Sequence, residues 1–100
     1  MPAETHVARG PVDPDDVFRV VRAHLAEILS VDEDEITLDT RVVDDLHADE
    51  LAILDLVEAV EEEMGERTVG FAIDDDDLVD LRTVRDYVEY VLERMRSTQS

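Results

Sequence analysis

The chain has 100 residues, of which 44% are hydrophobic, and its 28 acidic and 9 basic residues give a formal net charge of −19. This length supports one domain with one modest core, and the charge excludes nucleic acid and anionic membranes as favoured partners while favouring basic protein surfaces. The absence of cysteine excludes disulfides, thiolate nucleophiles and zinc sites of the Cys type.

Residues 1–12 are polar, include Gly10 and Pro11, and predict a flexible leader. They contain no long apolar run, so we expect neither a signal peptide nor a transmembrane segment. A monomer in the cytoplasm is the expectation that follows by default.

The first helix is predicted to begin after Asp13, because an N-cap acid followed by Pro14 is a typical helix start. Apolar residues recur at helical spacing from there to Ser30. They are Val17, Val20, Val21, Leu25, Ile28 and Leu29. A long loop then extends to Ala48, and we expect its apolar residues to pin it to the core. These are Val31, Ile36, Leu38, Val42, Val43 and Leu46.

A second helix is predicted from an N-cap at Asp49 to Met64, with Gly65 ending it. Its spacing suggests a stripe of inward-facing side chains. The stripe is Leu51, Leu54, Val57, Val60 and Met64.

The remaining chain predicts two more helices. Residues 66–73 read equally as a loop or a short extended piece, and Asp74–Asp77 suit the capped start of a short third helix. Thr83 and Asp86 resemble a capping box at the start of the last helix. Its apolar stripe is Val84, Val88, Val91, Leu92 and Met95. The prediction is an all-α four-helix bundle over residues 13–96, with a long first loop, a short third helix and a tail at 97–100.

The run Val43–Leu51 resembles the attachment motif of acyl carrier proteins, in which Asp-Ser-Leu follows Asp-Leu-Gly-Ala. Leu54–Met64 is similar to the second helix of that family, and Leu81–Val91 to the start of its last helix. The resemblance covers roughly residues 15–95. It implies the carrier fold and, as family cofactor, 4'-phosphopantetheine joined to the motif serine.

Here the serine position holds Glu50, flanked by Asp49 and Leu51. A carboxylate cannot form the phosphodiester, so no cofactor is expected on this chain. No other hydroxyl replaces the serine, because the candidates lie in the first loop, at a helix end or in the tail. These are Thr37, Thr40, Ser30, Ser97 and Ser100.

Further departures fall on or near the surface that family members present to their enzymes: His47 stands at a usual glycine, Ala52 at a usual acid and Glu58 at a usual apolar residue, and the stretch after Gly65 is longer than usual. Three explanations of Glu50 remain open. The chain is a native carrier relative that is not modified, or a genuine carrier with an engineered serine-to-glutamate change, or a product of drift in which Glu50 serves only as a first-turn acid.

The resemblance implies docking to basic patches on enzymes of fatty-acid, polyketide or nonribosomal peptide biosynthesis. The expected docking residues are Asp49, Glu50, Asp55, Glu58, Glu61 and Glu62. An acidic decoy for a nucleic-acid-binding surface is the alternative from another class. We expect no metal site from the neighbours His47, Asp49 and Glu50, and no enzyme activity, because the chain shows no nucleophile or ligand set.

Overall fold

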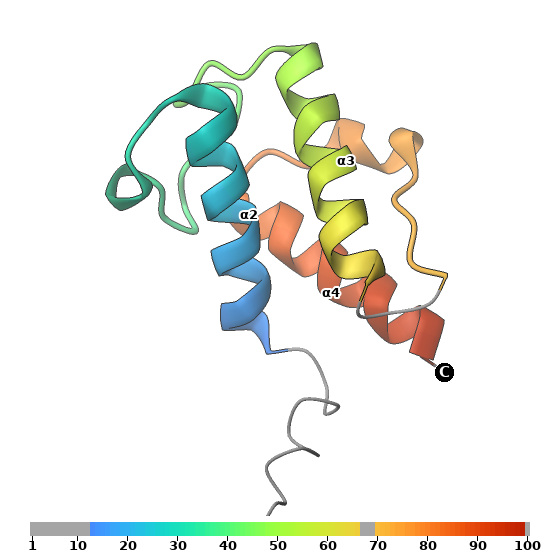
Figure 1. Cartoon of the computed structure of the whole chain (residues 1–100). Coiled ribbons are helices and arrows are strands. Elements are labelled where there is room, and N and C mark those ends of the chain that lie inside the picture. Colours follow the sequence, from blue (N-terminus) through green and yellow to red (C-terminus); the bar gives the residue numbers. More distant parts are fainter. Residues whose placement is uncertain (1–12, 67–69, 100) are drawn as a thin grey trace, which may run out of the picture.

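The computed structural model describes residues 13–66 and 70–99, and these form a small all-α bundle, as predicted (Figure 1). Its elements are α2 (Pro14–Leu29), η1 (Glu33–Glu35), α3 (Glu50–Gly65), η2 (Asp75–Asp80) and α4 (Val84–Gln99). The predicted leader, residues 1–12, lies outside the described residues. Helix α4 continues to Gln99, past the expected start of the tail at residue 97.

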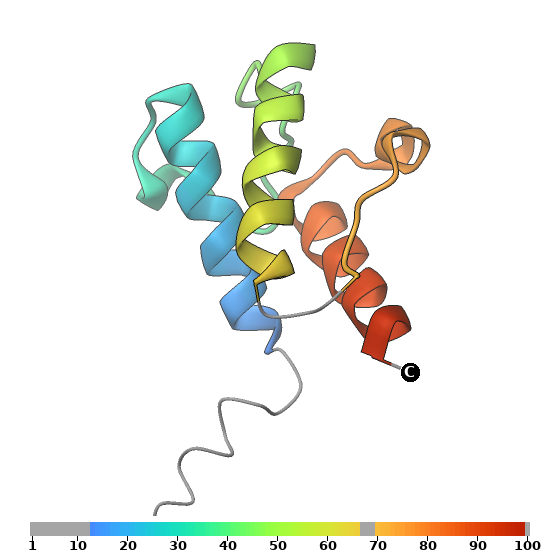
Figure 2. The same cartoon turned by 45° about the vertical axis from the view of Figure 1, so that its right-hand side comes forward.

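Helix α2 is the central element, since it packs against both α3 and α4. Figures 1 and 2 show α3 running antiparallel to α2, while α4 crosses beside them. The side chains between these helices are almost completely removed from solvent. The largest of them are Leu25, Ile36, Leu56, Met64 and Met95. The core is therefore mainly aliphatic, with sulfur from Met64 and Met95 and two aromatic rings, those of Phe71 and Tyr87.

Both ends of α2 match the sequence prediction. Asp13 is the N-cap, its side chain accepting a hydrogen bond from the Asp15 amide at 3.1 Å, and Pro14 is the first helical residue. Ser30 ends the helix in the left-handed conformation with φ 58°. These are local signals, and each acts through its immediate neighbours.

The long loop between α2 and α3 is pinned to the core and also to the start of α4. Ile36 and Val42 are buried, and the Val42 amide donates to the Arg82 carbonyl at 2.9 Å. The expectation for Val43 was wrong, because 49% of this residue is exposed. Since Val42 turns inward to the core, its neighbour in this turn faces solvent instead.

Helix α3 faces the core with a different stripe from the one predicted. Val57, Val60 and Met64 are buried as expected, but Leu51 is 67% and Leu54 39% exposed. Leu56, which the prediction omitted, is buried to 1% exposure and takes the inward position. The stripe that points at α2 is therefore rotated towards Leu56.

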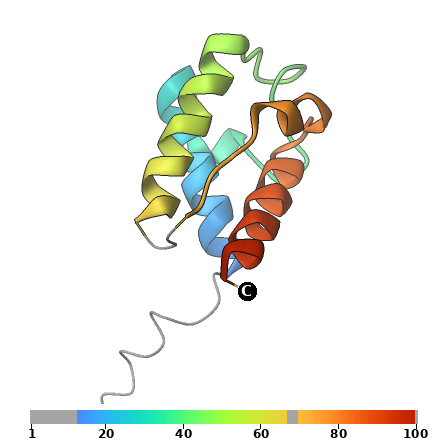
Figure 3. The same ribbon diagram turned by 90° about the vertical axis from the view of Figure 1, so that its right-hand side faces the viewer.

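The short third helix is η2, a 3-10 helix of six residues without a buried residue (Figure 3). It begins with acids, as expected, since Asp75, Asp76 and Asp77 form its first turn, but its N-cap Asp74 makes no side-chain cap hydrogen bond. Instead, Tyr90 of α4 holds the segment: its hydroxyl donates to Asp77 Oδ2 at 2.8 Å and accepts from the Asp74 amide at 3.0 Å. The Asp77 carboxylate therefore attaches this segment to α4.

The predicted capping box at the start of α4 is confirmed. The Asp86 amide donates to Thr83 Oγ1 at 3.1 Å, and Asp86 Oδ2 accepts from the amides of Arg82 at 2.9 Å and Thr83 at 3.1 Å. These hydrogen bonds, that from Arg82 first, hold the pKa of Asp86 below its ordinary value of 3.8. The charged carboxylate therefore stabilises the folded state.

We expect Asp86→Asn to lower the free energy of unfolding at pH 7 by about 1 kcal/mol, the usual size of a lost cap. Because the folded-state pKa is depressed, this stabilisation is present above the unfolded value and is lost as pH falls below about 3.8 through the folded value. Urea unfolding of both proteins from pH 7 to pH 2.5 should show the difference shrinking over that range. Asp80→Asn, the same charge change at an exposed site, is the control; a difference independent of pH would contradict the prediction.

Candidate functional site

The serine-equivalent position lies at the exposed start of α3. Asp49 is the N-cap, as predicted, and its Oδ1 accepts the Ala52 amide at 2.8 Å. Glu50 is the first residue of the helix and is exposed to solvent. A negative charge in this turn is favoured by the helix dipole. The side chain that replaces the serine is thus accessible, and the helix start that presents it is intact.

The turn before α3 contains His47, one of the departures from the family motif. His47 has φ 59°, in the left-handed region that glycine adopts most readily. Asp45 supports this turn, because it accepts the Arg41 backbone amide at 2.8 Å and the Arg41 guanidinium at 3.1 Å. Both bonds, the backbone one first, lower the pKa of Asp45. Histidine therefore occupies a backbone conformation suited to the glycine of the motif.

The acids expected to dock partners fall into two groups. Asp55, Glu58 and Glu62 are exposed along α3, together with Asp49 and Glu50 at its start. Glu61 is half-buried, and its Oε2 accepts the Ile73 amide at 2.8 Å. It therefore holds the segment before η2 against α3 in addition to any surface role. No arginine or lysine occurs between residues 42 and 66, so this face is uniformly acidic.

An open groove of about 550 Å³ lies between the start of α3 and η2, and we call it the α3/η2 groove. Its apolar lining residues are Val43, Ala48, Ile53, Leu54, Leu78 and Val79. The polar lining residues are two carboxylates, Glu50 and Asp75. Val79 is 80% exposed and Leu51, beside Glu50, 67% exposed. The site therefore combines acidic side chains with exposed aliphatic ones.

One contact between α2 and α3 was not foreseen. His24 on α2 and Glu63 on α3 are joined at 2.9 Å between Nε2 and Oε1. The two residues are 39 positions apart, and neither lies in a motif, so no local signal could have paired them. This contact links the outer edges of the two helices.

The site does not fit the chemistry of the family cofactor. Glu50 offers a carboxylate where a phosphodiester to 4'-phosphopantetheine needs a hydroxyl. Within residues 13–66 and 70–99, no group of three or more histidine, aspartate or glutamate side chains is placed to hold a metal ion. The arrangement is suited to binding a partner, because the start of α3 and η2 present carboxylates and apolar side chains together.

Comparison with known proteins gives the family. Residues 19–91 match the family model described as "Phosphopantetheine attachment site". The acyl carrier protein of Petrotoga mobilis is 40% identical over 81 residues, which cover 81% of this chain and 89% of that protein. That of Clostridium perfringens is 42% identical over 77 residues, covering 77% and 95%, and that of Thermotoga maritima 36% over 81 residues, covering 81% and 94%.

The bundle, the motif at the start of α3 and these matches define a small helical carrier domain. The chain belongs to the acyl carrier protein family. Members of this family are carriers rather than enzymes, in agreement with the prediction of no catalytic activity. Among the described residues, no helix is both long and apolar enough to span a membrane.

Proposed function

We propose that this protein is an unmodified acyl-carrier-like docking protein. It binds carrier-recognising enzymes of fatty-acid, polyketide or nonribosomal peptide biosynthesis without carrying a phosphopantetheine arm, and acts as a monomer in the cytoplasm. The observation that carries the proposal is the position of Glu50, exposed at the first residue of α3 on a family-typical scaffold. Glu50 stands at the position of the reactive serine, at a capped and exposed helix start.

Electrostatics supports the choice of partner surface. The exposed acids of α3 have no cation among them in sequence, so a partner that contributes arginine and lysine meets no competing positive charge. Such a surface also steers a basic partner during diffusion, with an attraction that added salt weakens. The exposed side chains of Leu51 and Val79 add an apolar contribution at the centre and the edge of the contact.

A binding measurement tests the docking role. We expect a broad-specificity phosphopantetheinyl transferase, without coenzyme A, to bind the chain in isothermal titration calorimetry. Asp55→Lys should weaken this binding about tenfold, because a like charge then faces the basic patch. The matched control is Glu33→Lys on η1, which makes the same charge change outside α3. Equal weakening by both substitutions would show that only net charge matters, and no binding at all would refute the docking proposal.

A further inference from the structure

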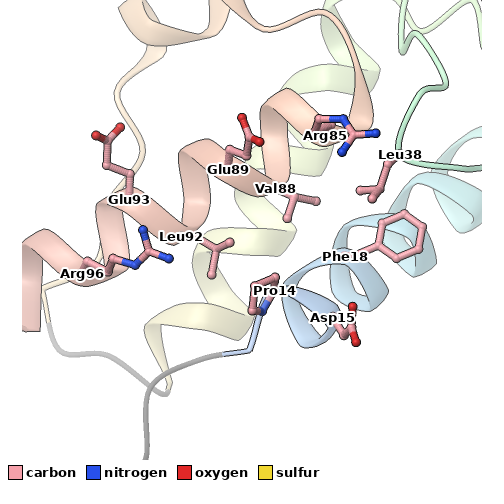
Figure 4. Close-up of a pocket in the computed structure, with 10 residues that line it drawn as sticks. All are labelled: Pro14, Asp15, Phe18, Leu38, Arg85, Val88, Glu89, Leu92, Glu93 and Arg96. Atoms are coloured by element: carbon pink, nitrogen blue, oxygen red, sulfur yellow. The ribbon is translucent and has the colours of Figure 1, made fainter.

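The α3/η2 groove differs in charge from a second groove, which lies between α2 and α4. That second groove is lined by three carboxylates and also by the guanidinium groups of Arg85 and Arg96 (Figure 4). The α3/η2 groove is lined by six apolar side chains and two carboxylates, and among the described residues no arginine, lysine or histidine lines it. Charge complementarity therefore favours a cation in the α3/η2 groove.

The apolar and the acidic parts of this groove differ in exposure. Ala48 is 5% exposed, and Ile53 and Leu78 are half-buried and pack against the hydrophobic core. The two acids, Glu50 and Asp75, are exposed to solvent. The groove therefore has an apolar floor that is continuous with the core and a rim that carries two carboxylates.

Both rim carboxylates are available to a ligand. Asp49, beside Glu50, and Asp77, two positions after Asp75, each accept a hydrogen bond from another residue of the protein. In the part of the chain that the structure describes, the carboxylates of Glu50 and Asp75 make neither a hydrogen bond nor an ion pair with another residue. The start of α3 carries about half a positive charge, which the full charges of two carboxylates outweigh. A cation at the rim therefore displaces no internal partner.

We propose that the α3/η2 groove binds a small apolar amine, with its apolar body on the floor and its ammonium group at Glu50 and Asp75. The groove volume of about 550 Å³ lies inside the range of about 300–1,000 Å³ that is usual for small-molecule sites. An anionic ligand is disfavoured because it meets two carboxylates at the rim. A neutral ligand of the same shape gains only the contact with the floor.

The order of apolar floor and acidic rim favours a free amine over a lysine side chain of a docked protein. A lysine carries its ammonium group at the far end of its stem, so it enters the groove charge first and places that charge on the apolar floor. A free amine enters with its apolar end first and leaves its ammonium group at the hydrated rim. The proposal therefore concerns a small molecule and does not rest on the proposed docking role.

The test uses phenethylamine as the probe, because its ring shifts the NMR signals of nearby methyl groups. The intact protein is titrated at about 0.15 M salt, where exposed charges more than about 8 Å apart are largely screened. We expect saturable shifts that are largest at the methyl groups of Val43, Leu54 and Val79. Ethylamine, which lacks the ring, and phenethyl alcohol, which lacks the charge, should each bind at least about threefold more weakly.

Glu50→Gln should weaken phenethylamine binding about threefold, the effect of losing one exposed charge pair, and leave the binding of phenethyl alcohol unchanged. Glu58→Gln is the matched control, because it makes the same charge change at an exposed residue of α3 that does not line the groove. Equal weakening by both substitutions would overturn the proposal.

Three other results would also overturn it: no saturable binding, shifts centred on the groove between α2 and α4, or equal binding of phenethylamine and either of its two analogues. These titrations use the protein alone. Their failure therefore leaves the transferase calorimetry, which tests the docking role, unaffected.

Discussion

A Glu50→Ser variant is expected to gain the mass of one phosphopantetheine group when incubated with a broad-specificity phosphopantetheinyl transferase and coenzyme A, whereas the unchanged protein gains none. The reason is chemical: the transferase joins a phosphate to a hydroxyl, and position 50 offers a carboxylate. The structural conditions for recovery are met, because residue 50 is exposed and Asp49 caps the helix through its bond to Ala52. Intact mass spectrometry reads the result directly.

Glu50→Ala is the matched control for this experiment. It removes the same carboxylate without supplying a hydroxyl, so it must remain unmodified. If the serine variant folds, as judged by circular dichroism, and still gains no mass, the surface around His47, Ala52 and Glu58 no longer fits the transferase. That outcome would contradict the view that a single residue separates this chain from a working carrier.

Leu56→Ala is expected to lower the free energy of unfolding by about 2–5 kcal/mol, the usual effect of truncating a fully buried leucine. Leu56 is 1% exposed in the core. Small domains have a total stability of roughly 5–15 kcal/mol, so this loss is a large share. At about 4–8 °C per kcal/mol, the melting temperature should fall by at least about 8 °C.

Leu51→Ala supplies the comparison within the same helix. Leu51 is 67% exposed, and surface substitutions of this kind usually change stability by less than about 0.5 kcal/mol. Thermal unfolding of the two variants therefore measures which side of α3 faces the core. Similar destabilisation by both, or a larger effect at Leu51, would restore the stripe that periodicity alone predicted.

The elements that sequence predicts well are those with local causes. The N-cap at Asp13, the proline that follows it and the reciprocal bonds of Thr83 and Asp86 involve residues at most a few positions apart. The motif also placed Glu50 correctly at the start of α3. Each of these signals is complete within one turn of chain and needs no knowledge of the remaining fold.

The inward side of α3 was predicted poorly because its first turns are apolar in almost every direction. Leu51, Ile53, Leu54, Leu56 and Val57 follow one another within seven residues, so the hydrophobic spacing does not select one side. Packing against α2 makes the choice, and it favours Leu56. Tertiary contact decided what local pattern left undetermined.

The same limit applies to the sites. The bond between His24 and Glu63 joins residues from two helices, and Phe18 of α2 lines one groove with Val88 and Leu92 of α4, from the opposite end of the chain. Tyr90 reaches Asp77 in the same way. Neither periodicity nor a motif predicts how two helices are placed relative to each other. Contacts between residues of different helices are therefore seen only in the folded structure.

The position of Tyr90 gives the protein a built-in optical signal. The chain has no tryptophan, and its two tyrosines, Tyr87 and Tyr90, both lie on α4. Tyr87 is buried in the core, whereas the hydroxyl of Tyr90 is bound to Asp77 of η2. Release of η2 transfers one phenol to water while the other stays in place. Near-ultraviolet spectra of the unlabelled protein can therefore distinguish a loosened third helix from unfolding of the bundle.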